Sequence, residues 1–190
     1  MSLNRRRAST HINRRAASNF FNGVAYAEKI GRPLSTFVTI NFWHTDCPDE
    51  EASERFERLR DNYFCPWLQY KRKRHPRAQI GAPTYAWSIE QDKGHTHVHW
   101  MVYLPPRLKK EFNARLEHWV EAVAGQVHVA ESAIHVKTAD RRPGLAAYLM
   151  KGLDKRVASQ FRVRPKKQGT VHGKRCGVSR NLGPTARSTH

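Results

Sequence analysis

The residues of this sequence with the clearest chemical potential are three alternating histidines, His95, His97 and His99. Successive side chains of a strand point to opposite faces, so the three imidazoles would share one face while Val98 and Trp100 share the other. Two imidazoles two residues apart on a strand can converge on one divalent ion. We therefore expect His97 and His99 to bind a metal, with the apolar face packed against helices.

A third metal ligand is expected on the preceding strand. Glu90 lies seven residues before His97, across the expected hairpin, and alternates with Ser88, which predicts that it faces the side of the histidines. Gln91 is the alternative ligand, because a bulge at Gly94 would shift the register by one residue. A mixed imidazole–carboxylate site suits Mg²⁺ or Mn²⁺, and Zn²⁺ is also possible.

A tyrosine and a lysine form the second candidate pair. Tyr148 and Lys151 are three residues apart, so they would share one face of a helix. A phenol that attacks phosphorus must lose its proton, and its reference pKa is about 10. A nearby metal and ammonium group would favour the charge that develops. The pair has no specificity alone, and its interest comes from its position after the fourth expected strand.

Hydrophobic periodicity predicts the elements that would position these residues. Strands are expected over 35–43, 84–91, 95–104 and 132–137, and helices over about 17–30, 46–74, 105–125 and 144–155. The strand–helix–strand–strand–helix–strand order, followed by one more helix, is the split βαβ or ferredoxin-like pattern. The expected fold class is therefore α+β, with one antiparallel sheet, two helices on one face, the other face free for a site, and an added helix that carries Tyr148.

The balance of charge indicates a polyanionic partner. The chain of 190 residues has 34 Lys and Arg against 16 Asp and Glu, a net charge of +18. Such a charge on a small protein points to nucleic acid, and no long apolar run supports a membrane partner. The residues expected to neutralise phosphates lie in basic clusters. They are Arg5, Arg6, Arg7, Lys71, Arg72, Lys73, Arg74, Lys174, Arg175 and Arg180.

Length and composition predict one compact domain. We expect a basic N-terminal arm over 1–18, the domain over 19–156 and a basic C-terminal extension over 157–190. Three scattered cysteines fit a reducing cytosol, and the first residues lack the apolar segment of a secretory signal. The expected location is the cytoplasm, and a monomer is favoured.

Three short motifs resemble those of the HUH endonuclease superfamily, which includes rolling-circle replication initiators, relaxases and single-tyrosine transposases. His97-Val98-His99 is similar to the family's His-hydrophobic-His motif, 37–41 (FVTIN) to its upstream strand motif, and 148–151 (YLMK) to its tyrosine motif. The resemblance covers roughly residues 35 to 155. No second tyrosine lies one helical turn beyond Tyr148, so the chain resembles single-tyrosine replication initiators.

The resemblance implies a metal-dependent DNA nickase with the HUH fold over 19–156. His97, His99 and Glu90 would hold the metal. Tyr148 would attack a DNA phosphate to leave a 5′-phosphotyrosine and a free 3′-OH, with Lys151 assisting by its charge or by positioning the phosphate. The implied partner is single-stranded DNA, as at an origin stem-loop of a plasmid, phage or mobile element in a bacterial host. Unwinding would fall to a host helicase or other replication proteins, or to supercoiling.

Other functions stay open at this point. A single-tyrosine transposase would use the same site and chemistry. A non-catalytic nucleic-acid-binding module on this fold would need aromatic residues on the open sheet face in place of histidines. A hydrolase that uses metal-activated water would not need Tyr148. Trp43 and Tyr103 are candidates for stacking on the bases of a single strand.

Overall fold

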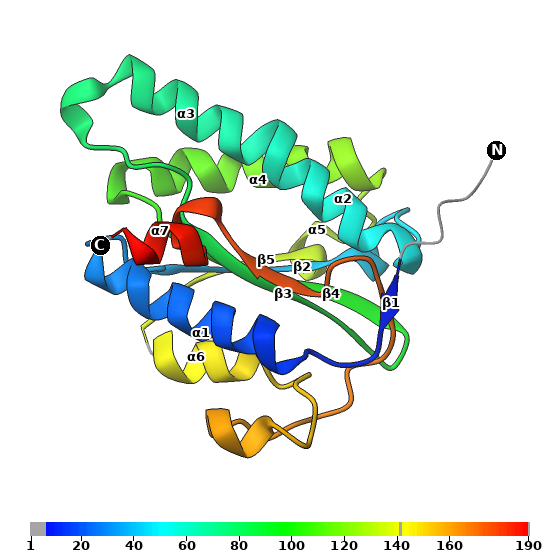
Figure 1. Cartoon of the computed structure of the whole chain (residues 1–190). Coiled ribbons are helices and arrows are strands. Elements are labelled where there is room, and N and C mark those ends of the chain that lie inside the picture. Colours follow the sequence, from blue (N-terminus) through cyan, green and yellow to red (C-terminus); the bar gives the residue numbers. More distant parts are fainter. Residues whose placement is uncertain (1–6, 141, 190) are drawn as a thin grey trace.

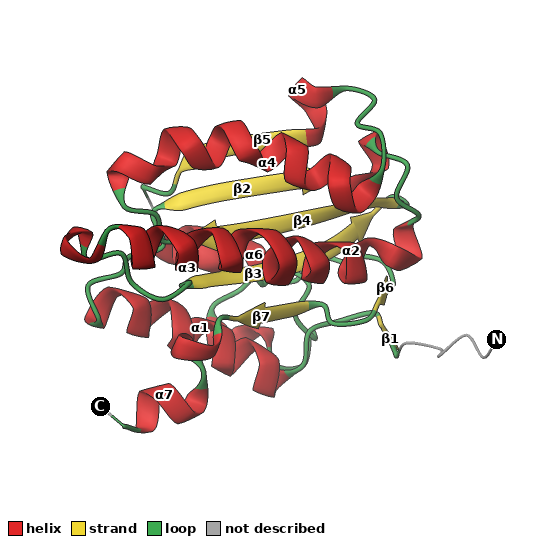
Figure 2. Ribbon diagram, turned by 90° about the horizontal axis from the view of Figure 1, so that it is seen from above, coloured by secondary structure: helices red, strands yellow, loops and turns green. Residues whose placement is uncertain are grey.

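A five-stranded antiparallel sheet forms the centre of the computed structural model, which describes residues 7–140 and 142–189 (Figures 1 and 2). The strand order is β5-β2-β4-β3-β7. These strands are β2 (Thr36–Asn41), β3 (Tyr85–Asp92), β4 (His95–Val102), β5 (Ile134–Thr138) and β7 (Cys176–Val178). A separate two-stranded ladder pairs β1 (Ala8–Ser9) with β6 (Val171–His172).

Helices cover both faces of this sheet. On one face lie α2 (Ala52–Arg58), α3 (Cys65–Arg74) and α4 (Lys109–Ala124), and on the other α1 (Arg14–Lys29) and α6 (Arg142–Leu149) (Figure 1). A π-helical segment, Leu59–Phe64, joins α2 to α3. The short helices are α5 (Ala130–Ala133) and α7 (Pro184–Ser188), and 3₁₀ turns cover Phe42–His44, Asp49–Glu51, Pro76–Ala78, Pro106–Leu108, Ala158–Phe161 and Arg180–Leu182. Within the described ranges, no helix is long and apolar enough to cross a membrane.

The face under α2, α3 and α4 is an aromatic core. Trp87 of β3 and Trp100 of β4 point to this side and are fully buried. Phe56 of α2 contacts the Trp100 ring edge-on, with centroids 5.5 Å apart, and Phe112 of α4 contacts it at 6.0 Å. Each such side chain contributes roughly 1.5–3 kcal/mol by burial, and edge-on ring contacts add to that. The predicted packing of the apolar face of β4 on helices is confirmed.

The opposite face carries a second, smaller core. Phe20 of α1 and Leu149 of α6 pack with Ala86 of β3 and Met101 of β4. The predicted α+β class and antiparallel sheet are confirmed, but the expectation that this face stays free is wrong. Helix α1 covers this face of the sheet. Its buried residues at 17, 20, 24 and 27 recur at helical spacing and form an apolar side that packs on the sheet.

Both ends of the chain extend further into the fold than expected. Helix α1 begins at Arg14, inside the segment expected as a basic arm, because Asn13 caps it by accepting a hydrogen bond from the Ala16 amide at 2.9 Å. At the other end, β7 pairs with β3, and the Ile89 amide donates to the carbonyl oxygen of Arg175 at 2.7 Å. Residues of the segment 157–190 therefore complete the edge of the sheet.

Replacing Leu182 tests whether the C-terminal segment is integral to the fold. Leu182 is fully buried in the second core, so Leu182→Ala should lower the free energy of unfolding by about 2–5 kcal/mol in urea titrations. Val129, which is 47% exposed, provides the control, and Val129→Ala should change it by less than about 0.5 kcal/mol. Equal stability of the two variants would contradict an integral C-terminal segment.

Candidate functional site

The hairpin between β3 and β4 places Glu90 with the histidines. Glu90 pairs in register with His97, and Ser88 with His99. Lys93 and Gly94 both have positive φ, at 55° and 82°, as a two-residue hairpin turn of this kind requires. No bulge shifts the register.

Gln91, the alternative ligand, points to the opposite side. Its amide Nε2 donates to Asp49 Oδ2 at 3.1 Å. The two-residue turn thus decides the choice of register that the sequence left open, and Glu90 shares the face of His97 and His99.

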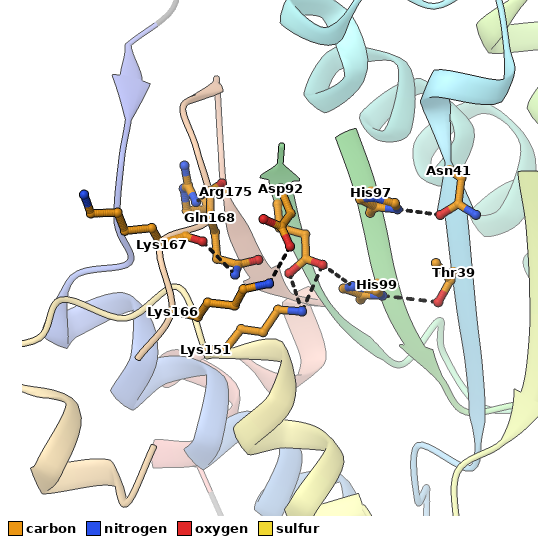
Figure 3. Close-up of polar contacts among 11 residues, drawn as sticks. Thr39, Asn41, Asp92, His97, His99, Lys151, Lys166, Lys167, Gln168 and Arg175 are labelled. Carbon is orange, nitrogen blue, oxygen red and sulfur yellow. Dashed lines mark hydrogen bonds and ion pairs between the residues drawn. The ribbon is translucent and has the colours of Figure 1, made fainter. Parts of the chain in front are cut away.

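Asn41 on β2 orients the first imidazole (Figure 3). Its Nδ2 donates to the carbonyl oxygen of Ser132, which can only accept, so its Oδ1 is the atom that faces His97 Nδ1 at 2.6 Å. Nδ1 of His97 must therefore carry the proton, and the lone pair of its Nε2 is free. Burial lowers the pKa of His97, which favours this neutral form.

The second imidazole is held between a carboxylate and a hydroxyl. Nε2 of His99 lies 2.9 Å from Glu90 Oε1, and Nδ1 lies 3.2 Å from Thr39 Oγ1. A carboxylate only accepts, so Nε2 carries a proton here. The Thr39 hydroxyl can donate or accept, which lets His99 move its proton to Nδ1 when Nε2 binds a cation. The rings of His97 and His99 are parallel within 4°.

Lys151 of the segment after α6 completes the charge balance. Its Nζ lies 3.0 Å from Oε1 and 2.9 Å from Oε2 of Glu90. Burial alone would raise the pKa of Glu90, but the hydrogen bonds and charges of His99 and Lys151 outweigh it and lower the pKa to about 2. Glu90 is 8% exposed and stays ionised.

Tyr148 lies beside this cluster at the end of α6. Its ring is 5.3 Å from the His99 ring, and Lys151 Nζ is 3.8 Å from the Tyr148 centroid. The helix expected over 144–155 ends at Leu149, so Lys151 meets Tyr148 from the turn that follows the helix. Tyr148 is 45% exposed, and its hydroxyl can meet a ligand from solvent. Residues 90, 97, 99, 148 and 151, far apart in sequence, thus form one continuous group of contacts.

The donor set of this cluster fits a divalent ion. Two imidazoles and a carboxylate share one face, and each imidazole has an outer partner on β2, the arrangement that orients metal-binding histidines. As the described part of the chain stands, no three His, Cys, Asp or Glu side chains are grouped to hold an ion. The Glu90 carboxylate instead faces His99 and Lys151, and it would have to exchange these contacts to bind one.

Some residues around the site had no predicted role. Asn41 and Thr39 lie in the β2 segment that resembled a motif, but only the pairing of β2 with β4 sets them opposite His97 and His99. Phe37, two residues further along, stacks on His99 with centroids 5.6 Å apart. Lys166 pairs with Asp92 next to Glu90 (Figure 3).

The aromatic candidates lie apart from the ion-binding set. Trp43 is 43% exposed and its ring lies 4.6 Å from that of His95, at the outer end of the histidine face. His95 is exposed and contacts none of the groups around Glu90 among the described residues. Tyr103 packs against the second core.

The residues expected to bind DNA are scattered over the molecule. Arg5 and Arg6 lie outside the described residues. Arg7, Lys174 and Arg180 are exposed. Arg72, Lys73 and Arg74 are exposed in the last turn of α3, on the sheet face opposite the site (Figure 1). Lys71 pairs with Glu111 at 2.6 Å.

Arg175 does not fit the expected role of a DNA contact, because it is 5% exposed. Its guanidinium donates to the carbonyl oxygens of Ser9, Gln168 and Gly169. Burial lowers its pKa to about 10. The side chain therefore ties the N-terminal ladder to the C-terminal segment, and the prediction of a phosphate contact is wrong.

No family model, no curated protein and no solved structure matches this chain.

Arg175→Ala should act on stability. Three backbone carbonyl oxygens would lose the hydrogen bonds of a buried guanidinium, so the free energy of unfolding should fall by about 3 kcal/mol in urea titrations. The exposed Arg180 serves as the control, and Arg180→Ala should change it by less than about 0.5 kcal/mol. If Arg175→Ala left stability intact and weakened DNA binding instead, the structural assignment would be refuted.

Asn41→Ala tests the orientation of His97. Without the Asn41 carbonyl oxygen, the ring loses the partner that keeps its Nε2 unprotonated. Affinity for Mn²⁺ in calorimetric titrations should fall roughly 10- to 100-fold, as for other outer partners of metal-binding histidines. The matched variant Asn22→Ala, on the exposed side of α1, should bind Mn²⁺ as the wild type does, and equal affinity of both variants would argue against this role of Asn41.

Proposed function

We propose that this protein is a metal-dependent endonuclease that nicks and rejoins single-stranded DNA through a phosphotyrosine at Tyr148. The observation that carries the proposal is the contact of Tyr148 with His99 and of Lys151 with both Tyr148 and Glu90. A buried ionised carboxylate and two oriented imidazoles are costly to keep in a core, and they are expected where chemistry needs them.

Each group has a part in the proposed reaction. The exposed Tyr148 hydroxyl attacks phosphorus; the new bond joins its oxygen to phosphorus, and the bond from phosphorus to the 3′ oxygen breaks. The phenol gives up its proton as it attacks; the electron pair of the broken bond stays on the 3′ oxygen, which takes up a proton and becomes a 3′-OH. Lys151, beside the phenol ring, offers positive charge to the attacking oxygen and to the phosphate. The reverse attack by a 3′-OH releases Tyr148 and joins strands.

The metal has a limited part in this account. An Mg²⁺ or Mn²⁺ ion bound by His97, His99 and Glu90 would supply Lewis acidity toward a non-bridging phosphate oxygen. The neutral His97, with its proton held on Nδ1 by Asn41, offers a lone pair on Nε2 for this purpose.

The burial of the site disfavours a module that only binds nucleic acid. On such a sheet face bases would stack on exposed aromatic rings. Here His99 and Glu90 are 5% and 8% exposed, and they are bonded to each other. For the biological setting we propose initiation of rolling-circle replication, which the motif resemblance favours. A single-tyrosine transposase would share the chemistry. Nicking at an origin stem-loop would indicate the initiator, and nicking at a transposon end would indicate the transposase.

Incubation with single-stranded oligonucleotides and Mn²⁺ tests the nucleophile. We expect a protein–DNA adduct that survives denaturation and is absent in Tyr148→Phe, because the phenyl ring has no attacking oxygen. Tyr70, which is 57% exposed on α3, provides the control: Tyr70→Phe should form the adduct at the wild-type level.

Removing the metal or one ligand separates chemistry from binding. EDTA or His97→Ala should abolish cleavage while salt-sensitive DNA binding persists. Cleavage that survives in Tyr148→Phe would rule out the nucleophile, and cleavage unaffected by EDTA and His97→Ala would rule out the metal.

A further inference from the structure

A basic groove lies on the edge of the sheet, away from Tyr148 and the histidines. Its volume is about 1010 Å³. Three segments line it: the first turns of α1, the stretch from Lys174 through β7, and α7. We call this the edge groove.

The charged side chains that line the edge groove are all cations among the described residues. Arg14, Arg15, Lys174 and Arg187 contribute four positive charges, and no carboxylate stands among its described lining residues. Arg187 is anchored, since its Nη2 donates to Asn19 Oδ1 at 3.0 Å. The groove therefore presents a positive field to solvent that no acidic side chain of its lining offsets.

Two of these cations lie at the N-terminal end of a helix, where positive charge lowers the stability of the helix. Arg14 and Arg15 occupy the first turn of α1, a helix of 16 residues that has no acidic residue in that turn. The N-terminal end of a helix carries partial positive charge, so cations there are unfavourable for stability. Local conflicts of this kind are expected where a residue serves binding, and an anionic ligand would relieve this one.

The floor of the groove adds backbone donors. Strand β7 is an edge strand, and Arg175 and Ser179 on either side of it bond to β3. In an antiparallel ladder the bonding direction alternates, so the N–H groups of Cys176 and Val178 turn away from β3 toward the groove. Lys174 crosses Gly177, where a Cβ would lie 3.2 Å from the Lys174 Cε, so the missing side chain leaves space for the lysine.

The edge groove is also tied to the site. The Ile12 amide, just before the α1 cap, donates to the carbonyl oxygen of Gly152 at 2.8 Å, and Gly152 follows Lys151. The start of α1 therefore adjoins the segment that carries Lys151.

We infer that the edge groove binds the sugar–phosphate backbone of nucleic acid at a place separate from the catalytic residues. The inference rests on the proposed function for the identity of the polyanion as nucleic acid. Arginines and a lysine that converge with amide donors are the groups that hold phosphates without reading bases. The three-residue length of β7 offers little edge for a peptide strand to pair with.

Charge reversal in two matched helices tests the edge groove. Arg14→Glu/Arg15→Glu changes the first turn of α1, and Lys109→Glu/Lys110→Glu makes the same change in the first turn of α4, also 16 residues long. Binding of a single-stranded oligonucleotide to the full chain is measured by fluorescence anisotropy in EDTA, from about 50 to 200 mM salt. Two lost phosphate contacts should reduce the slope of log affinity against log salt by about 1.4 in the α1 variant, with little change in the α4 variant.

Thermal unfolding gives the second measurement. The α1 variant should melt at the wild-type temperature or above it, because the substitutions remove a repulsion at the helix end. Weaker binding in a variant that is no less stable supports the edge groove. An equal reduction of the salt slope in both variants would show a response to net charge alone and overturn the inference. The inference would also be overturned if polyglutamate of equal charge displaced the oligonucleotide as strongly as competitor DNA does.

These outcomes are independent of catalysis. If the wild type forms no adduct through Tyr148 but the slope of log affinity against log salt is still reduced in the α1 variant, the proposed nuclease function fails and the edge groove stands. If the adduct forms and the slope of the α1 variant stays at the wild-type value, the edge groove fails and the nuclease function stands.

Discussion

The site depends on the pairing of the ionised Glu90 carboxylate with Lys151 and His99. A charge buried in this way is tolerated only when it is paired and hydrogen-bonded. Lys151 and His99 meet that need from two directions, one from the end of α6 and one from β4. The pairing of Lys151 with Glu90 also places Tyr148 over the histidine face, because Tyr148 lies three residues before Lys151 and contacts it. The position of the proposed nucleophile therefore follows from the pairing of a charge.

The alternation of side chains along β3 and β4 separates two environments only one residue apart. Trp100 belongs to the aromatic core, and the neighbouring His99 belongs to the site. This separation lets a rigid apolar layer support groups that need exact hydrogen-bond partners. It also makes the site sensitive to register, since a shift of one residue would exchange the two faces. The two-residue turn at Lys93 and Gly94 removes that ambiguity.

The large positive charge of the chain is divided among different tasks. Arg175 is buried and holds backbone carbonyl groups together, whereas Lys71 is paired with Glu111. Arg14 and Arg15 line the edge groove, and no carboxylate is among the described residues that line it. Net charge indicates the class of partner but not which cations meet it, because a guanidinium can donate to backbone carbonyl oxygens as well as to a phosphate.

Local pattern was enough to predict the α+β class, the hairpin, the shared face of His97 and His99, and the helix that carries Tyr148, whereas the choice of Glu90 over Gln91 needed the geometry of the turn. These features depend on the periodicity of strands and helices, which a sequence displays directly. The role of Asn41, the burial of Arg175 and the cover that α1 gives to the second face depend on contacts between residues distant in the chain. No spacing in the sequence encodes such contacts, because strand pairing and helix packing bring the partners together only when the chain folds.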